Sequence, residues 1–228
     1  MKTQKILSLI LAIALVFSVG CVSAFAETVE PLVFDTDTVL DLSVEGSFKA
    51  DGEDGAIRAE KGAKLTINGT DETIVTAKYV KEYTMAVWAK DQGTVVTING
   101  GYYTNERDPN KEDQADLIYA SLDADIVING GTFKCVTPKW TLNCKDNSNG
   151  TITVKGGKFY QFNPAEAQVG EGEIVVPAGY SVVEGADGWY EVVSNAKVFS
   201  TNGTLDLTET GSFEADGEDG AIRAEKRC

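Results

Sequence analysis

Short runs of alternating apolar and polar residues fill most of the chain, and the same runs return at regular intervals. In each interval, a first run places two apolar residues on one side of an extended chain, and a second run repeats this after a turn. A third inward position, reached after a glycine-rich turn, is aromatic in the later intervals. Because the period is two throughout, the pattern predicts strands and argues against helices.

Four blocks define the length of this repeat. They read LTING, TINGG, VINGG and TVKGG, and they begin at residues 65, 97, 127 and 153. The spacings of 31, 30 and 26 residues between equivalent positions suit one circuit of three short strands. One circuit cannot bury its own apolar face, whereas circuits stacked about 4.8 Å apart pair their backbones and superimpose like residues.

The fold is therefore predicted to be all-β, a right-handed parallel β-helix of about four coils, since nearly all parallel crossovers are right-handed. The first strands are expected to point Ile57 and Ala59, Val87 and Ala89, Ile118 and Ala120, and Leu142 and Cys144 inward. The second strands contribute Leu65 and Ile67, Val96 and Ile98, Ile126 and Ile128, and Ile152 and Val154. The third strands contribute Tyr103, Phe133 and Phe159.

The expected organisation is a signal peptide at 1–26, N-terminal cap strands at 27–54, coils at 55–165, a hairpin cap at 166–197 and a truncated second module at 198–228. Two alternating runs joined at Asp187-Gly188 predict the hairpin, which would cover the end of the stack. The segment 34–61 returns 165 residues later with its last twelve residues identical. We expect a poorly packed tail there, and further domains in the parent chain.

The first residues have the pattern of a secretory signal. Lys2 and Lys5 precede an apolar run, and Ala24-Phe25-Ala26 offers a small-residue cleavage site. Cleavage after Ala26 predicts a secreted or cell-surface protein. Lipidation at Cys21 is disfavoured, because Ser18 stands where an aliphatic residue is usual. No later stretch is long and apolar enough to predict a membrane span.

Charge narrows the choice of partners and chemistry. The chain has 20 basic and 35 acidic residues, a net charge of −15 and no histidine. This balance argues against nucleic acid and anionic membranes as partners, and any catalysis would need carboxylate, lysine or arginine groups. Cys135 and Cys144 are either small core residues or, after export, a disulfide.

The outward positions of the first strands form a candidate contact strip. Arg58, Trp88, Tyr119 and Asn143 are expected to stack on consecutive coils, with Lys90 beside them. Aromatic faces at this spacing suit the apolar face of a sugar or an aromatic side chain of a protein partner. The alternative is that Trp88 and Tyr119 only stabilise the sheet by cross-strand packing.

Two further groups of residues have structural or metal-binding interpretations. Asn68, Asn99 and Asn129 are predicted to form a ladder of turn residues that bond the backbone of the adjacent coil. No cofactor is expected. Asp51, Glu53 and Asp54 offer carboxylates in a glycine-bearing turn, which could hold Ca²⁺ or simply be solvated.

The NGGTF-type units, the Asn163-Pro164 segment and the AGY…DGWYEV hairpin resemble pectate-lyase-like β-helical surface proteins of gut Firmicutes and similar phage tail proteins. The resemblance covers roughly residues 55–193. It implies an extracellular β-helix, in a family that includes polysaccharide lyases and hydrolases as well as adhesins. A pectate-lyase site would need a dense carboxylate cluster, whereas this chain offers Asp91, Asp146 and Lys90.

Three functions remain open from the sequence. The preferred one is a bacterial, non-catalytic binding or adhesion module that presents a flat sheet face to a glycan or extracellular polymer. The alternatives are a carbohydrate-active enzyme that acts on an acidic polysaccharide, and a structural spacer in a surface repeat array. The missing carboxylate cluster disfavours catalysis.

Overall fold

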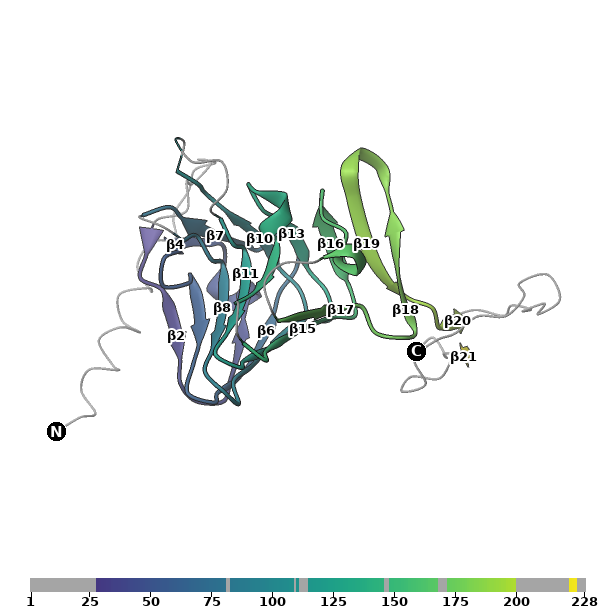
Figure 1. Cartoon of the computed structure of the whole chain (residues 1–228), viewed down its shortest axis with the longest axis horizontal. Helices are drawn as coiled ribbons and strands as arrows, with labels where there is room; N and C mark the ends of the chain where they lie inside the picture. The colour runs from purple at the N-terminus through teal and green to yellow at the C-terminus, as the bar shows by residue number, and fades with distance from the viewer. Residues whose placement is uncertain are drawn as a thin grey trace.

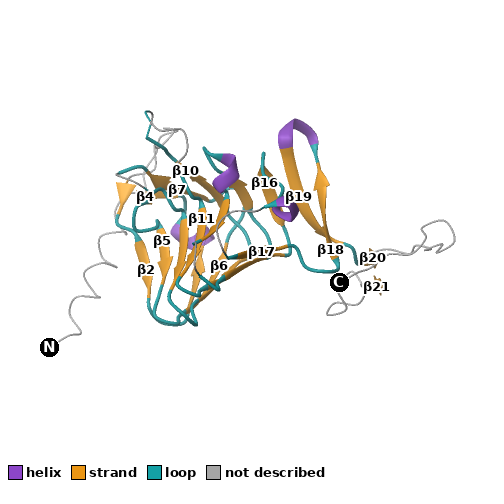
Figure 2. Cartoon of the chain, viewed as in Figure 1, coloured by secondary structure: helices purple, strands orange, loops and turns teal. Residues whose placement is uncertain are grey.

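The structure is a computed structural model that describes residues 28–80, 83–108, 110, 115–145, 148–167, 172–199 and 222–224 (Figure 1). The predicted signal peptide at 1–26 and most of the predicted second module at 198–228 lie outside these residues. The regular structure of the described part is almost all strand, and loops and turns connect the strands (Figure 2). Its helices are a single turn, α2 (Leu42–Glu45), and the 3-10 turns η1 (Pro138–Trp140), η2 (Pro164–Glu166) and η3 (Ala186–Gly188).

Three sheets run along the stack of coils. Sheet A contains β1 (Thr28–Val29), β4 (Phe48–Asp51), β7 (Ile74–Lys78), β10 (Tyr102–Asn105), β13 (Thr132–Lys134), β16 (Gly157–Tyr160), β19 (Trp189–Ser194) and β18 (Tyr180–Glu184). Sheet B contains β2 (Leu32–Phe34), β5 (Ile57–Ala59), β8 (Val87–Lys90), β11 (Ile118–Ser121) and β14 (Leu142–Cys144). Sheet C contains β3 (Thr38–Asp41), β6 (Lys64–Asn68), β9 (Val95–Ile98), β12 (Asp125–Ile128), β15 (Thr151–Val154) and β17 (Glu173–Val175).

The predicted parallel solenoid is confirmed. Each of the four predicted coils contributes one strand to each sheet, and neighbouring coils pair in parallel. Strands β2, β3 and β4, from the segment expected to form cap strands, pair in the same way with the first predicted coil. The N-terminal segment therefore continues all three sheets by one more set of strands.

The inward files have the predicted register. Val87 is paired with Ile57 on one side and Ile118 on the other, and Ile118 is paired with Leu142. All four side chains are fully buried. The second strands behave likewise, with Ile98 paired to residues 67 and 128. Superposition of like side chains is thus what fills the core between the sheets.

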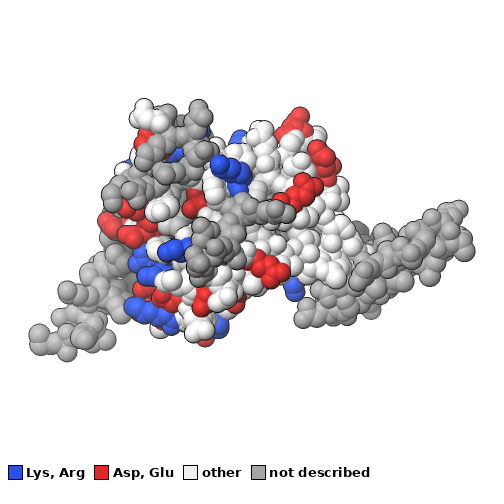
Figure 3. All heavy atoms as spheres, viewed as in Figure 1, with Lys and Arg blue, Asp and Glu red and all other residues white. Residues whose placement is uncertain are grey.

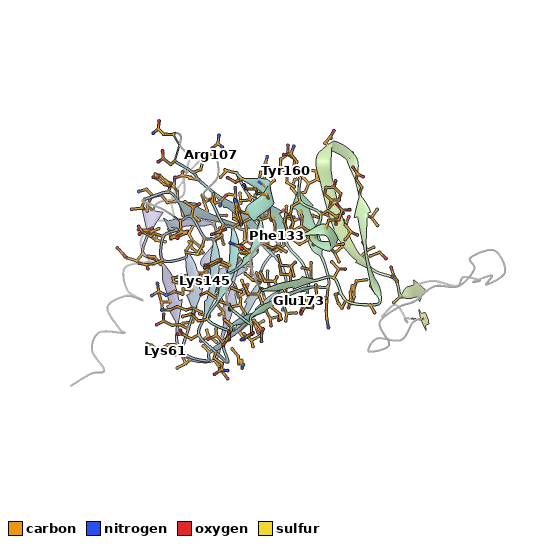
Figure 4. The ribbon with its side chains drawn as sticks, viewed as in Figure 1. Lys61, Arg107, Phe133, Lys145, Tyr160 and Glu173 are labelled. Carbon is orange, nitrogen blue, oxygen red and sulfur yellow. The ribbon has the colours of Figure 1, made fainter. Side chains whose placement is uncertain are left out.

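The third file is a column of stacked aromatic rings. Phe133 lies between Tyr103 and Phe159, with centroid separations of 5.2 and 4.9 Å and interplanar angles of 9° and 10°. Figure 4 shows Phe133 inside the coil stack, whereas Lys61 lies at its margin. The Tyr103 hydroxyl donates to the Gly100 carbonyl over 2.8 Å, so the one polar atom of this column is satisfied.

The two glycines of each Gly-Gly turn serve different purposes. A Cβ on Gly100 or Gly156 would lie 2.2 or 2.1 Å from a carbonyl oxygen of the preceding coil, so the first glycine permits close approach of the coils. Only the second glycine has a positive φ, which is 106° at Gly101 and 104° at Gly157. Backbone bending therefore requires the second glycine, and coil stacking requires the first.

The asparagine ladder exists but is bonded differently from the prediction. Asn129 Nδ2 donates to Asn99 Oδ1, and Asn99 Nδ2 donates to Asn68 Oδ1, both over 2.9 Å. The amides therefore bond one another rather than the backbone of the adjacent coil. Each primary amide carries both a donor and an acceptor, so identical residues at one coil spacing can form a continuous chain.

The C-terminal hairpin is confirmed with one correction. Strands β18 and β19 pair antiparallel across η3, and β19 pairs antiparallel with β16, so the hairpin extends sheet A. The first predicted hairpin strand is split at Pro177, because β17 instead joins sheet C beside β15. Beyond the hairpin, β20 (Lys197–Phe199) and β21 (Ile222–Ala224) pair in the register of β2 and β5, 165 residues earlier.

Candidate functional site

Sheet B carries the predicted outward strip. Trp88 is in register with Arg58 on one side and Tyr119 on the other, and Tyr119 is in register with Asn143. All four are half-buried. The rings of Trp88 and Tyr119 have centroids 6.3 Å apart and are tilted by 45°, so they form a stepped aromatic surface rather than a flat one.

A groove of about 410 Å³ lies over this surface, and we call it the sheet B groove. Aromatic, cationic and acidic side chains line it: Tyr83, Trp88, Tyr119, Lys90, Lys145, Glu53 and Asp54. Tyr83 is 47% exposed. Figure 4 shows Lys145 beside the strands of sheet B. An aromatic floor with a few convergent polar groups is the usual composition of a ligand site.

The Trp88 side chain is fixed in place by its neighbours. Its Nε1–H donates to Ser121 Oγ over 2.9 Å. The Arg58 guanidinium and the Lys90 ammonium lie 5.6 and 5.5 Å from the ring centroid, within the range of cation–π attraction. This hydrogen bond satisfies the indole and leaves the ring as an oriented, half-buried contact surface.

Arg58, predicted as a contact residue, has a different position. It does not line the sheet B groove and instead pairs with Asp54 over 3.2 Å and Glu60 over 3.1 Å. Its guanidinium therefore contacts the Trp88 ring without lining the groove. Of the predicted ligand residues, the structure brings Trp88, Tyr119 and Lys90 together in the groove.

The acidic turn does not form the calcium site considered from the sequence. Asp51 Oδ1 accepts a hydrogen bond from the Glu53 amide over 2.9 Å, and Asp54 pairs with Arg58. Within the described ranges, three or more potential metal-ligating side chains do not gather anywhere. Glu53 and Asp54 instead contribute acidic groups to one part of the sheet B groove.

A second cavity of about 280 Å³ adjoins the groove and shares Tyr83, Tyr119 and Lys145 with it. We call it the corner pocket, because Asp116 and Trp140 reach it from the bends that precede β11 and β14. This pocket was not predicted from the sequence, because bend residues form it.

Asp116 has the most strongly shifted pKa among the carboxylates of the described residues. It is 8% exposed, and burial raises its pKa to about 6, although a hydrogen bond of 2.9 Å from Asn143 Nδ2 partly opposes the shift. The sequence contained one signal for it. Two residues before the first inward residue of a coil, the neighbouring coils have Met85 and Trp140, whereas this coil has a carboxylate.

A cavity of about 570 Å³ lies away from the sheet B groove, on the outer face of sheet A where the hairpin joins it. Tyr102, Val183 and Trp189 form much of its wall. Asp71 lies in it and accepts a hydrogen bond of 2.9 Å from Thr132 Oγ1. Sequence reasoning did not place this cavity, because the hairpin brings Trp189 next to strands far away in the chain.

Of the two alternatives for Cys135 and Cys144, the disulfide is not formed. Cys135 and Cys144 are both buried free thiols. Burial raises the pKa of each to about 12, so neither is a reactive thiolate at neutral pH. The interpretation as small core residues is the one that the structure supports.

Acidic and basic side chains are interspersed on the face in view, with several acidic ones on the hairpin (Figure 3). Within the described ranges, no helix has the length and apolar character needed to cross a membrane. No protein-family model, curated protein or solved structure matches this chain. Function must therefore be argued from the groove and its neighbours.

Proposed function

We propose that this chain is a secreted or cell-surface glycan-binding module, without catalytic activity, whose contact surface is the sheet B groove. The observation that carries the proposal is the pairing of Trp88 and Tyr119 in register on adjacent coils, inside a groove that also presents Lys90 and Lys145. The apolar face of a pyranose ring packs on such aromatic side chains, and flanking ammonium groups hydrogen-bond its hydroxyls.

A solenoid suits this role for a physical reason. Its β8 and β11 strands are fixed by parallel pairing and by fully buried side chains on their inner side. The outer side chains are therefore held in position before the ligand arrives. Preorganisation of this kind reduces the conformational entropy lost on binding. Export follows from the signal-like segment at 1–26, and the resemblance to β-helical surface proteins agrees with it.

The test is retention on an array of plant, fungal and bacterial glycans. The wild-type protein is expected to be retained, and Trp88→Ala to lose about tenfold in affinity for the same glycan. Trp189→Ala, which removes an indole from the cavity on sheet A, is the matched control and should bind normally. Melting temperatures of both variants establish that they fold. Equal retention of wild type and a folded Trp88→Ala variant would refute the proposal.

A carbohydrate-active enzyme is the second candidate, because Asp116 has the raised pKa expected of a general acid. Glycosidases use a pair of carboxylates, and within the described residues Asp116 is the one carboxylate that lines the corner pocket. Asp146 lies outside the described residues. Incubation with uronic-acid polymers, with and without calcium, tests this candidate. New reducing ends that disappear with Asp116→Asn, or unsaturated product that disappears with Lys90→Ala, would favour the enzyme.

A spacer in a repeat array is the third candidate. The pairing of β20 with β21 repeats the register of β2 with β5, which supports tandem modules in the parent chain. Binding and spacing are compatible functions. A spacer without binding would show no retention on any glycan.

A further inference from the structure

Two residues that line the corner pocket each carry a buried polar atom whose hydrogen-bonding capacity is unmet. Trp140 Nε1, a donor, and Asn143 Oδ1, an acceptor, have no hydrogen-bond partner although both are out of contact with solvent. Buried polar atoms of this kind are rare in native proteins, because each costs about 1–3 kcal/mol. Two of them in the wall of one pocket of about 280 Å³ therefore require an explanation.

The orientation of the Asn143 amide follows from its other hydrogen bond. Nδ2 donates to Asp116 Oδ1 over 2.9 Å, so the oxygen of the amide is the atom that remains without a partner. Asn143 belongs to β14 and is in register with Tyr119, so its backbone is fixed by the sheet. The unmet acceptor is therefore held at the junction of the pocket and the sheet B groove.

The backbone of Trp140 is held in place, and its ring contacts a neighbouring cation. Its backbone is fixed on both sides, since its amide donates to Thr137 over 2.9 Å and its carbonyl accepts from Leu117 over 3.1 Å. The ammonium of Lys139 lies 5.1 Å from the centroid of its ring. A loose surface indole could turn towards water, whereas this one belongs to a hydrogen-bonded bend between two sheets.

We infer that the corner pocket is the subsite of the sheet B groove that holds one neutral sugar residue, through a hydroxyl that donates to Asn143 Oδ1 and accepts from Trp140 Nε1. The inference rests on the proposed function. A hydroxyl supplies both a donor and an acceptor from one atom, and it is present on every sugar. A carboxylate or sulfate offers acceptors alone, so it would leave the Asn143 oxygen unmet and would add negative charge beside Asp116.

Trp88, Tyr119 and the corner pocket then form one continuous binding surface. A glycan chain would pack on Trp88 and Tyr119 in the groove, and the sugar next to Tyr119 would enter the pocket. Tyr119, Tyr83 and Lys145 line both cavities, so no wall of separate residues divides them. Small side-chain movements of Trp140 and Asn143 would bring their buried atoms to the hydroxyl. A site that pairs a sugar hydroxyl strongly disfavours analogues that lack it.

The decisive variant is Trp140→Phe, which keeps an aromatic ring and removes the unmet donor. In the free protein the donor makes no hydrogen bond, so the substitution should leave the urea midpoint unchanged or raise it. In the complex the donor is used, so affinity should fall about fivefold. A residue that only stabilises the fold would give the opposite pattern, with lower stability and unchanged affinity.

The experiment is calorimetric titration of wild type, Trp140→Phe, Trp88→Ala and the control Trp189→Phe with the tetrasaccharides of glucose, mannose, xylose and galacturonic acid. We expect a neutral tetrasaccharide to bind best, Trp140→Phe to weaken it about fivefold and Trp189→Phe to leave it unchanged. If Trp88→Ala abolishes binding while Trp140→Phe binds like wild type, the proposed function stands and the subsite is wrong. Tightest binding of tetragalacturonate would also overturn the subsite. Absence of binding by every tetrasaccharide would overturn both.

Discussion

Burial of Asp116 makes a quantitative prediction about stability and pH. The folded protein holds the proton of this carboxyl with a pKa of about 6, compared with the ordinary value of 3.8 expected when the chain is unfolded. The folded state therefore binds more protons than the unfolded state between these two values. The stabilising contribution of the Asp116 carboxyl is fully present below pH 3.8 and is lost as pH rises through 6.

Asp116→Asn removes this titration while it keeps an oxygen that can accept from Asn143. A shift of about two units corresponds to about 3 kcal/mol in total, of which about 1.4 kcal/mol falls between pH 5.0 and pH 7.5. The variant should therefore gain about 1.4 kcal/mol over wild type when the comparison moves from pH 5.0 to pH 7.5. All other titratable groups change the free energy of unfolding of wild type and Asp116→Asn equally, so their effects cancel when the two proteins are compared.

Urea denaturation followed by tryptophan fluorescence measures this difference, with salt added to limit association near the isoelectric point of 4.4. Asp187→Asn is the control, because it removes the same charge from the exposed hairpin turn. A stability difference between Asp116→Asn and wild type that is the same at both pH values would show that the carboxyl is not desolvated. The corner pocket would then be more open than described.

Substitutions in the aromatic column, the Gly-Gly turn and the asparagine ladder test the solenoid itself. Phe133→Ala removes the middle ring of the aromatic column and should lower the free energy of unfolding by about 4 kcal/mol. Tyr103→Phe loses one hydrogen bond and should lower it by about 1 kcal/mol. Equal losses in urea titrations would contradict the stacking. Gly156→Ala places a methyl 2.1 Å from a carbonyl oxygen and should lower the free energy of unfolding by about 3 kcal/mol. In Gly185→Ala the closest contact of the methyl is at 3.5 Å, so the melting temperature should stay nearly unchanged. Asn99→Ala breaks two ladder hydrogen bonds and should lower stability by about 1–2 kcal/mol, and an unchanged melting temperature would mean that water replaces them.

Much of the fold could be predicted because the solenoid repeats a local pattern. The alternation around Ile57, Val87, Ile118 and Leu142 fixes which side chains point inward, and stacking follows from the return of the same three-strand pattern in each unit. The outward register of Trp88 with Tyr119 follows from the same rule. In a parallel sheet, the register of one residue pair fixes the register of all other residues of the two strands.

Features that depend on the exchange of partners between coils could not be predicted in the same way. The asparagine amides bond each other because identical side chains meet at one coil spacing. The sequence alone does not distinguish this arrangement from hydrogen bonds to the backbone of the adjacent coil. The first glycine of each turn is required by a carbonyl of another coil, which no local rule reveals. Pro177 ended the predicted hairpin strand, and the residues before it joined sheet C.

The candidate site was partly predictable for the same reason. Trp88, Tyr119 and Lys90 lie on strands, so their positions followed from the register. Asp116 and Trp140 lie in the bends between sheets, where loop lengths differ from coil to coil. Sequence periodicity carries no information about which bend residues converge, and the corner pocket is made of such residues.

The most direct measurement of glycan binding by the sheet B groove is a two-dimensional NMR titration of the ¹⁵N-labelled indoles with the tetrasaccharide that binds best. The chain has three tryptophans, which lie in the groove, the corner pocket and the cavity on sheet A. The signals of Trp88 and Trp140 should shift in a saturable way while that of Trp189 stays fixed. Shifts confined to Trp189, or no shift at saturating ligand, would contradict binding at sheet B.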